Sequence, residues 1–143
     1  MTTLLVVAVL SAVLSGGLSG KVVLSSDVKA FDVALQAEDR GIETVDTAQM
    51  KEMVASGAYL ILDARLPSEY EKSHIPTAKS VSIQFFEESF PEVLPLLSEG
   101  GPVVVYCTGP FCDDGLRLIE RMQEIGFYGA MLYVDGMEGW YDE

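Results

Sequence analysis

The chain has 143 residues, 49% of them hydrophobic, which allows one ordinary core and excludes a second full domain. Nine Lys and Arg residues against 22 Asp and Glu residues give a formal net charge of −13, and a surface of that sign repels phosphate backbones, so we expect no nucleic-acid partner. Cys107, Cys112 and the single His74 do not supply the four ligands of a structural zinc site, so we expect no metal and no cofactor.

The first 20 residues contain no charged side chain and include the apolar run TLLVVAVLSAVL. A helix of that length spans roughly 30 Å, enough to cross a bilayer. We therefore predict an apolar helix over residues 1–20 that anchors the protein in a membrane, with a cleaved export signal or a buried soluble helix as alternatives. Lys21 and Lys29 follow the run and nothing basic precedes it, which favours a cytoplasmic domain, with export as the alternative.

The remaining chain is predicted to contain a linker over residues 21–41 and a single α/β domain over residues 42–143. In chain order the patterns predict a helix over 47–56, a strand over 59–64, a brief helix from Pro67, a strand over 80–83, helical pieces up to Leu97, a strand over 102–107, a helix over 113–125 and a strand over 130–134. Because strands alternate with helices, we expect a mostly parallel central sheet with helices on both faces.

The segment VVVYCTGPFCDDG is the most informative part of the chain. A strand ends at Cys107 and is followed by a loop and a helix, and the predicted active-site loop comprises Cys107, Thr108, Gly109, Pro110, Phe111, Cys112 and Asp113. Ligands of open α/β sheets bind at the carboxyl ends of strands. A loop that enters a helix N-terminus there directs backbone N–H groups at one point and stabilises an anion, such as a thiolate or persulfide on Cys107. An inert, half-buried cysteine is the alternative.

Three separated motifs resemble the rhodanese family across residues 42–143. The stretch DARLPSEYEKSHIPTA (63–78) is similar to the family's Asp-x-Arg, acidic-aromatic and His-Ile-Pro signature. The six-residue loop that begins at Cys107 has the length typical of single-domain rhodaneses, and VDGMEGW (134–140) resembles the closing Gly-x-x-x-Trp signature. The resemblance implies a sulfurtransferase in which Cys107 takes sulfane sulfur from thiosulfate or a persulfide and passes it, as a persulfide, to a thiol acceptor.

The resemblance also implies supporting roles outside the loop. Asp63 and Arg65 would pair and brace the loop, and His74 would be packed and hydrogen-bonded. Glu69 and Tyr70 would fix a short helix against the sheet, and Trp140 would fill the core.

The loop departs from the family pattern in its charge. Many rhodaneses have an arginine in or at the end of the loop, whereas this loop has no cation and Pro110 lacks an N–H donor. Asp113 and Asp114 suit a helix N-terminus but repel a bound anion. We therefore expect weak turnover of thiosulfate and a neutral or protein-bound persulfide as donor. Asp113 also stands where related phosphatases have an arginine, which excludes phosphatase activity.

Cys112 raises a separate hypothesis, because it lies five residues after Cys107 in the same loop. As a resolving thiol it would attack the persulfide, release sulfide and leave a disulfide. The alternative is a small buried residue in place of serine or threonine. Two other functions compete with sulfur transfer, namely a thiol-disulfide redox protein that uses Cys107 and Cys112 and a non-catalytic binding or regulatory module. The spacing is wider than Cys-x-x-Cys, which counts against the redox protein.

Overall fold

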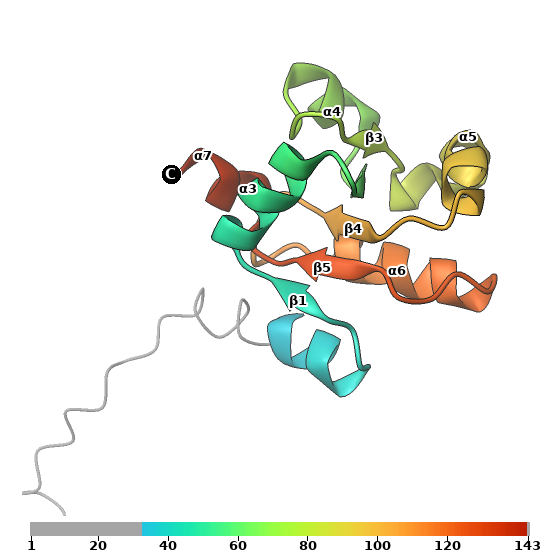
Figure 1. The fold of residues 1–143 in the computed structure, drawn as a ribbon, viewed down its shortest axis with the longest axis horizontal. Coiled ribbons are helices and arrows are strands. Elements are labelled where there is room, and N and C mark those ends of the chain that lie inside the picture. Colours follow the sequence, from blue (N-terminus) through green and yellow to red (C-terminus); the bar gives the residue numbers. More distant parts are fainter. Residues whose placement is uncertain (1–32, 143) are drawn as a thin grey trace, which may run out of the picture.

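The computed structural model describes residues 33–142. The predicted apolar helix over residues 1–20 lies outside that range, and so does most of the predicted linker (grey trace in Figure 1). Within residues 33–142 no helix combines the length and the apolar character needed to cross a membrane. The membrane anchor therefore stays a prediction.

The centre of the fold is a parallel sheet with the strand order β1-β5-β4-β2-β3 (Figure 1). Its strands are β1 (Thr44–Val45), β2 (Leu60–Asp63), β3 (Lys79–Ser80), β4 (Val103–Tyr106) and β5 (Met131–Tyr133). β4 lies between β2 and β5, with Val105 opposite Leu62 and Leu132. The α/β fold with a parallel sheet is confirmed. The loop that follows β4 therefore begins at the middle of the carboxyl edge of the sheet, where ligands of such folds bind.

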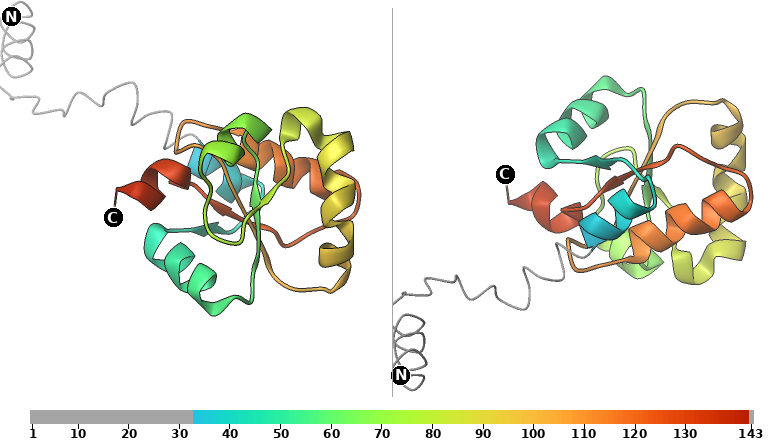
Figure 2. Two further views of the ribbon diagram at one scale, coloured as in Figure 1. Left: turned by 90° about the horizontal axis from the view of Figure 1, so that it is seen from above. Right: turned by 90° about the horizontal axis from the view of Figure 1, so that it is seen from below.

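Helices cover both faces of the sheet (Figure 2). They are a helix over residues 33–39, α3 (Thr47–Ser56), α4 (Pro67–Lys72), α5 (Phe86–Ser98), α6 (Asp114–Glu124) and α7 (Gly136–Tyr141), with a 3-10 turn at Ile83–Phe85. Successive side chains of a strand point to opposite faces. Accordingly Val103 and Val105 pack with the helix over 33–39, α5 and α6, whereas Val104 and Tyr106 pack with α3 and α7.

Local signals explain where two of these helices begin and end. The Asp46 carboxylate accepts a hydrogen bond from the Gln49 amide at 2.8 Å, and the Gln49 side chain accepts one from the Asp46 amide, so α3 starts with a capping box. Gly57, in the left-handed conformation, ends it. In α6 Leu116, Ile119 and Met122, which recur at helical spacing, are buried, whereas Ile125 is 44% exposed because the helix ends at Glu124.

The described part of the predicted linker belongs to the domain. Residues 33–39 form a helix whose Val33 and Ala37 are buried in the same core as Phe90. These two residues lie four positions apart and therefore share one helix face, whereas Leu35, on another face, is exposed. The helix over 33–39 therefore packs with the domain that is predicted over residues 42–143. The strand predicted over 80–83 is only β3, Lys79–Ser80, followed by a 3-10 turn.

Candidate active site

Cys107 follows the central strand β4 and is only 3% exposed. The loop after it is fixed from one side by α7, whose first backbone N–H groups donate to loop carbonyls. Met137 N donates to Cys107 O at 3.0 Å and Glu138 N to Thr108 O at 2.9 Å. Gly136 makes this approach feasible, because a Cβ at that position would collide with the carbonyl oxygen of Cys107. Two segments distant in sequence therefore shape the loop together.

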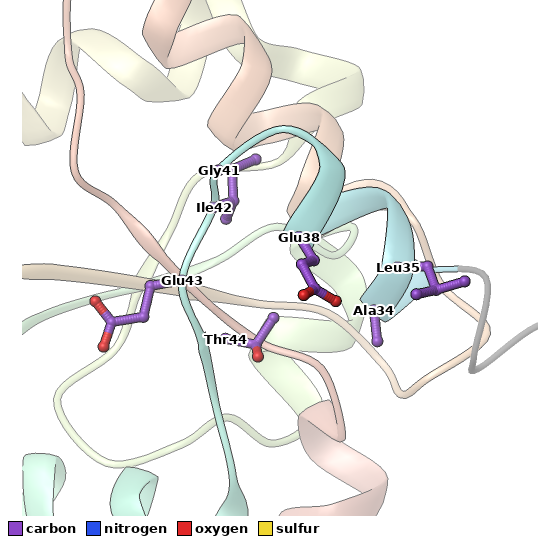
Figure 3. Close-up of a pocket in the computed structure, with 7 residues that line it drawn as sticks. All are labelled: Ala34, Leu35, Glu38, Gly41, Ile42, Glu43 and Thr44. Carbon is purple, nitrogen blue, oxygen red and sulfur yellow. The ribbon is translucent and has the colours of Figure 1, made fainter.

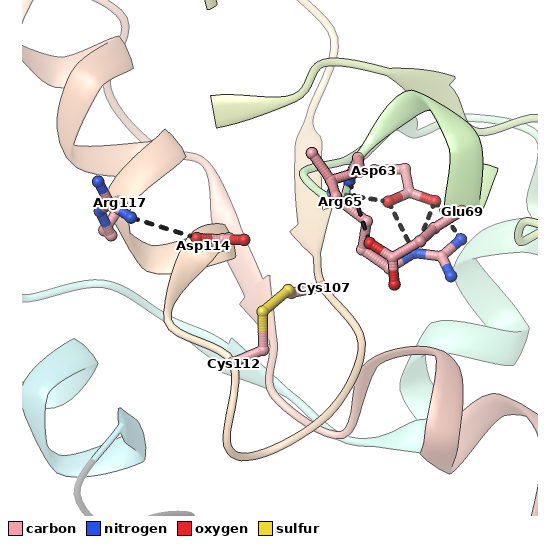
Figure 4. The surroundings of a disulfide bond; sticks show 8 residues. Asp63, Arg65, Glu69, Cys107, Cys112, Asp114 and Arg117 are labelled. Atoms are coloured by element: carbon pink, nitrogen blue, oxygen red, sulfur yellow. Dashed lines mark hydrogen bonds and ion pairs between the residues drawn. A yellow bond between two sulfur atoms is a disulfide. The ribbon is translucent and has the colours of Figure 1, made fainter. Parts of the chain in front are cut away.

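The structure joins Cys107 and Cys112 by a disulfide across the loop (Figure 4). Their Cα atoms lie 6.1 Å apart, and the Cys112 amide donates to the Gly109 carbonyl at 3.1 Å, which closes the turn between them. Cys107 is buried while Cys112 is half-buried. A thiolate is the reactive form of cysteine, so the bond must be reduced before either sulfur acts as a nucleophile.

Asp63 and Arg65 form a buried ion pair beside the loop. The Asp63 carboxylate accepts from Arg65 Nε at 3.0 Å, from Arg65 Nη2 at 2.7 Å and from the Tyr106 hydroxyl at 2.7 Å. Arg65 also donates to the Ser73 carbonyl at 2.7 Å, and Tyr106 accepts from the Ile75 amide at 3.1 Å. The pair therefore supports the loop through Tyr106, the residue before Cys107.

Titration in this network follows from burial and from the carboxylate. Burial opposes the charge of Arg65, but the hydrogen bond and charge of Asp63 outweigh burial and raise the pKa of the guanidinium. Burial, and then the Asp63 charge, raise the pKa of the Tyr106 hydroxyl. Both groups thus stay protonated, and Arg65 donates through Nη2 to Asp63 and to the Ser73 carbonyl.

His74 and Tyr70 contact each other and the backbone. The His74 ring stacks on the Tyr70 ring with centroids 3.8 Å apart, and His74 Nδ1 lies 2.8 Å from the Tyr70 carbonyl. His74 is exposed, but its ring packs on Tyr70 and its Nδ1 lies within hydrogen-bond distance of a backbone carbonyl. Tyr70 donates to the Ala78 carbonyl at 2.7 Å and packs against the core, as does Trp140.

The Asp114 carboxylate lies close to the disulfide. A carboxylate oxygen of Asp114 and both sulfur atoms all lie within 4.8 Å of one another. Its side chain is 22% exposed and pairs with Arg117 at 3.3 Å. Burial raises the pKa of Asp114, Arg117 acts in the opposite direction, and Asp113 and Glu69 raise it further. The sequence identified Asp114 as a residue of the helix N-terminus that repels a bound anion, but the spacing of residues does not reveal that its side chain turns toward the sulfurs.

Within residues 33–142, Cys107, Cys112 and Asp114 form the group of donor side chains that could hold a metal ion. In the disulfide state the two sulfurs are bonded to each other, which leaves the carboxylate alone. In the reduced state two thiolates and one carboxylate would be one donor short of a structural zinc site. The expected absence of a metal stays a prediction.

Acidic groups dominate the surroundings of the loop. The Glu138 carboxylate, from α7, occupies the space where a side chain at position 109 would stand. In the view of Figure 4, Asp114 lies on one side of the disulfide and Glu69 on the other, beside the Asp63–Arg65 pair. The nearby cations are engaged, Arg65 with Asp63 and Arg117 with Asp114. The site therefore opposes the approach of a multiply charged anion.

A hollow at the edge of the sheet lies apart from the cysteine loop and is not lined by either cysteine. It has a volume of about 590 Å³ and lies between the helix over 33–39 and the edge strand β1 (Figure 3). Its lining is Ala34, Leu35, Glu38, Gly41, Ile42, Glu43 and Thr44. It offers two carboxylates but no nucleophilic thiol, so the chemistry remains with the loop.

With the geometry established, comparison with known proteins identifies the family. A model of the rhodanese-like domain matches residues 46–143. The chain belongs to the rhodanese-like domain family. Among solved structures, the BH2092 protein of Bacillus halodurans is 22% identical with a TM-score of 0.63, covering 78% of this chain and 80% of that one. The human single-domain sulfurtransferase TSTD1 is 22% identical with a TM-score of 0.56, covering 70% of this chain and 96% of that one.

A curated relative is longer than this chain. The tRNA uridine(34) hydroxylase of Pelagibacter ubique (strain HTCC1062) is 25% identical over 102 residues, which are 71% of this chain and 34% of that protein. The chain thus spans about a third of the length of this relative. The solved structures show that the chain shares the fold of these proteins.

Proposed function

We propose that this rhodanese-like domain is a sulfurtransferase in which Cys107 carries sulfane sulfur as a persulfide. The observation behind the proposal is the position of Cys107, buried at the carboxyl end of the central strand in a loop that leads into α6. A nucleophile at that position lies where α/β folds bind ligands and close to the N-terminal amides of a helix.

The proposed cycle begins when a dithiol reductant opens the disulfide. The Cys107 thiolate attacks the sulfane sulfur of a donor R–S–SH, the bond between the two donor sulfurs breaks, R–S⁻ leaves, and Cys107 becomes a persulfide. A thiol acceptor then takes the outer sulfur. Alternatively the Cys112 thiolate attacks the Cys107 sulfur, which expels HS⁻ and closes the disulfide again.

The charge around the loop favours one class of donor. Asp114 and Glu138 are close to the loop, while the guanidinium groups of Arg65 and Arg117 already have carboxylate partners. Thiosulfate carries two negative charges and would approach against this field, whereas a neutral or protein-bound persulfide would not. We therefore expect thiosulfate to be the poorer donor and its reaction to accelerate with added salt, which screens the repulsion.

The proposal is tested by intact mass of the reduced protein after incubation with thiosulfate or a small persulfide. Cys112→Ser should accumulate a stable adduct of one sulfur atom, because it lacks the thiol that resolves the persulfide. Cys107→Ser, the matched control, should acquire none at position 107. Wild type should form the adduct transiently, then release sulfide and regain its disulfide. The absence of an adduct from both donors in Cys112→Ser would refute the proposal.

The disulfide itself favours a second candidate, a thiol-disulfide redox protein. Cys107 and Cys112 form an internal disulfide in a loop at a helix N-terminus, the arrangement that thiol exchange needs. This function predicts rapid exchange with dithiols but no sulfur adduct on Cys107. The same mass measurement therefore separates the two candidates.

A further inference from the structure

The Cys107–Cys112 pair has a proton-carrying group beside it that the sulfur chemistry above does not use. Asp114 starts α6, and its carboxylate lies within 4.8 Å of both sulfur atoms. Its side chain is 22% exposed, so it lies between the sulfurs and water without being sealed from either. A carboxyl group in that position can deliver a proton to a sulfur and recover it from solvent.

We propose that Asp114 is the acid–base residue of the Cys107–Cys112 pair and exchanges a proton with Cys112 whenever the disulfide opens or closes. The inference rests on the proposed function only in that the two cysteines cycle between dithiol and disulfide. It holds equally for the redox candidate.

The assignment to Cys112 follows from exposure. Cys107 is 3% exposed whereas Cys112 is half-buried, so a reductant thiolate can reach the Cys112 sulfur first. The disulfide breaks, Cys107 leaves as a thiolate, and a mixed disulfide forms between the reductant and Cys112. The second thiol of the reductant loses its proton to water and attacks its own mixed-disulfide sulfur. Cys112 then leaves as a thiolate and takes the proton of the Asp114 carboxyl.

Electrons and protons balance over these exchange reactions. The dithiol is oxidised to a disulfide, the two cysteines are reduced, and ionised Asp114 recovers a proton from water. In the reverse direction ionised Asp114 accepts the Cys112 proton, which produces the thiolate that attacks the Cys107 sulfur. Because thiolate rather than thiol is the nucleophile, that transfer speeds disulfide closure.

The neighbours of Asp114 favour a carboxyl that holds its proton longer than an exposed aspartate does. Burial raises the pKa of Asp114, and Asp113 and Glu69 raise it further, while the Arg117 guanidinium at 3.3 Å opposes them. On the α7 side the loop faces Glu138, another acid. Arg117 is therefore the cation that sets how far the titration moves, and its removal should shift the titration to higher pH.

The test measures the rate at which dithiothreitol reduces the disulfide of the full chain, across pH and normalised to the concentration of reductant thiolate. The disulfide of Asp114→Asn should be reduced about tenfold or more slowly than that of wild type at the pH where wild-type Asp114 is protonated. Its pH profile should also lack the inflection that Asp114 causes in wild type. Glu124→Gln is the matched control, since Glu124 forms the same i,i+3 pair with Arg121 on α6 away from the loop. It should behave as wild type. Arg117→Gln should keep the rate but move the inflection to higher pH.

A second readout needs no exchange reaction. In the reduced protein an ionised Asp114 disfavours a nearby thiolate, so Asp114→Asn should lower the thiol pKa of the pair by about one unit. The ultraviolet absorbance of the thiolates measures this titration. Asp114→Asn with wild-type rates and wild-type thiol titration would overturn the inference. If no sulfur adduct forms but exchange depends on Asp114, sulfur transfer fails and the inference stands. If the adduct forms but exchange does not depend on Asp114, sulfur transfer stands and the inference fails.

Discussion

The buried charged residues Asp63 and Arg65 lie beside the reactive loop. Asp63 is completely buried and Arg65 nearly so, and the carboxylate binds both the guanidinium and the Tyr106 hydroxyl. Removing one partner of such a pair leaves the other charge without compensation, which costs more than the pair contributes over an apolar substitute. The pair therefore matters chiefly because it fixes the residue that precedes Cys107.

We expect Asp63→Ala to lower the free energy of unfolding by about 3 to 5 kcal/mol, because the Arg65 guanidinium would remain buried and unpaired. Asp46→Ala, which removes the cap of α3, should cost only about 1 kcal/mol. Urea denaturation of the oxidised proteins measures both. Equal losses for the two variants would mean that Arg65 finds water or another partner when Asp63 is removed.

We expect Asp114 to lower the stability of the fold at neutral pH. A carboxyl whose pKa is raised by folding favours the neutral state in the fold, so its contribution to stability is full below the ordinary aspartate pKa and is lost as pH rises through the raised value. Asp114→Asn should therefore raise the melting temperature at pH about 7 and lose that advantage below pH about 4. A gain of equal size at both pH values would contradict the raised pKa.

At the scale of elements, α7 acts as a support for the active-site loop. Its first backbone N–H groups donate to the carbonyls of Cys107 and Thr108, and Gly136 lets the two segments approach. The closing VDGMEGW motif is thus a structural partner of the cysteine loop, although the two are separated by α6 and β5. The sequence related this motif to the family but did not reveal the contact.

Gly136→Ala should be more harmful than Gly57→Ala. Both glycines have a left-handed backbone, so both variants pay roughly 1 to 2 kcal/mol for that conformation. At Gly57 an added Cβ meets nothing within 4 Å, whereas at Gly136 it collides with the loop backbone. We expect Gly136→Ala to lose about 1 to 3 kcal/mol more, together with reactivity at Cys107. Thermal unfolding and thiol labelling measure the two effects, and equal behaviour would show that the loop moves away freely.

At the scale of the whole molecule, the domain extends further toward the N-terminus than its family match. The match covers residues 46–143, yet Val33 and Ala37 lie in the core that α5 and α6 form on one face of the sheet. Arg40 adds an ion pair to Glu120 on α6. The helix over residues 33–39 therefore completes the cover of that face rather than connecting separate parts.

A fragment of residues 33–143 should be more stable than one of residues 42–143. Deleting the helix over 33–39 exposes the surface that Val33 and Ala37 cover, and burial of a valine side chain alone contributes about 1.5 to 3 kcal/mol. We expect a difference of at least about 2 kcal/mol by urea denaturation of the two fragments. Identical midpoints would mean that the helix adds nothing to the core.

The sequence by itself determined the class of fold, the family and the position of the reactive loop. Short continuous apolar runs such as YLILDA and PVVVYC specify buried strands because their apolar residues must leave water, and α6 shows apolar residues at helical spacing. A strand of two residues such as β1 has no period to detect, and only two side chains of the helix over 33–39, Val33 and Ala37, are buried in the core.

The tertiary structure alone decided which side chains meet. The closure of Cys107 on Cys112, the carboxylate of Asp114 beside their sulfurs and the support of the loop by α7 depend on how the chain curls after β4 and where β5 delivers the next helix. Periodicity reports the face of an element, but it carries no information on contacts between elements. The chemistry of this loop depends on those contacts, because the distance between a carboxyl group and a sulfur decides whether a proton can pass between them.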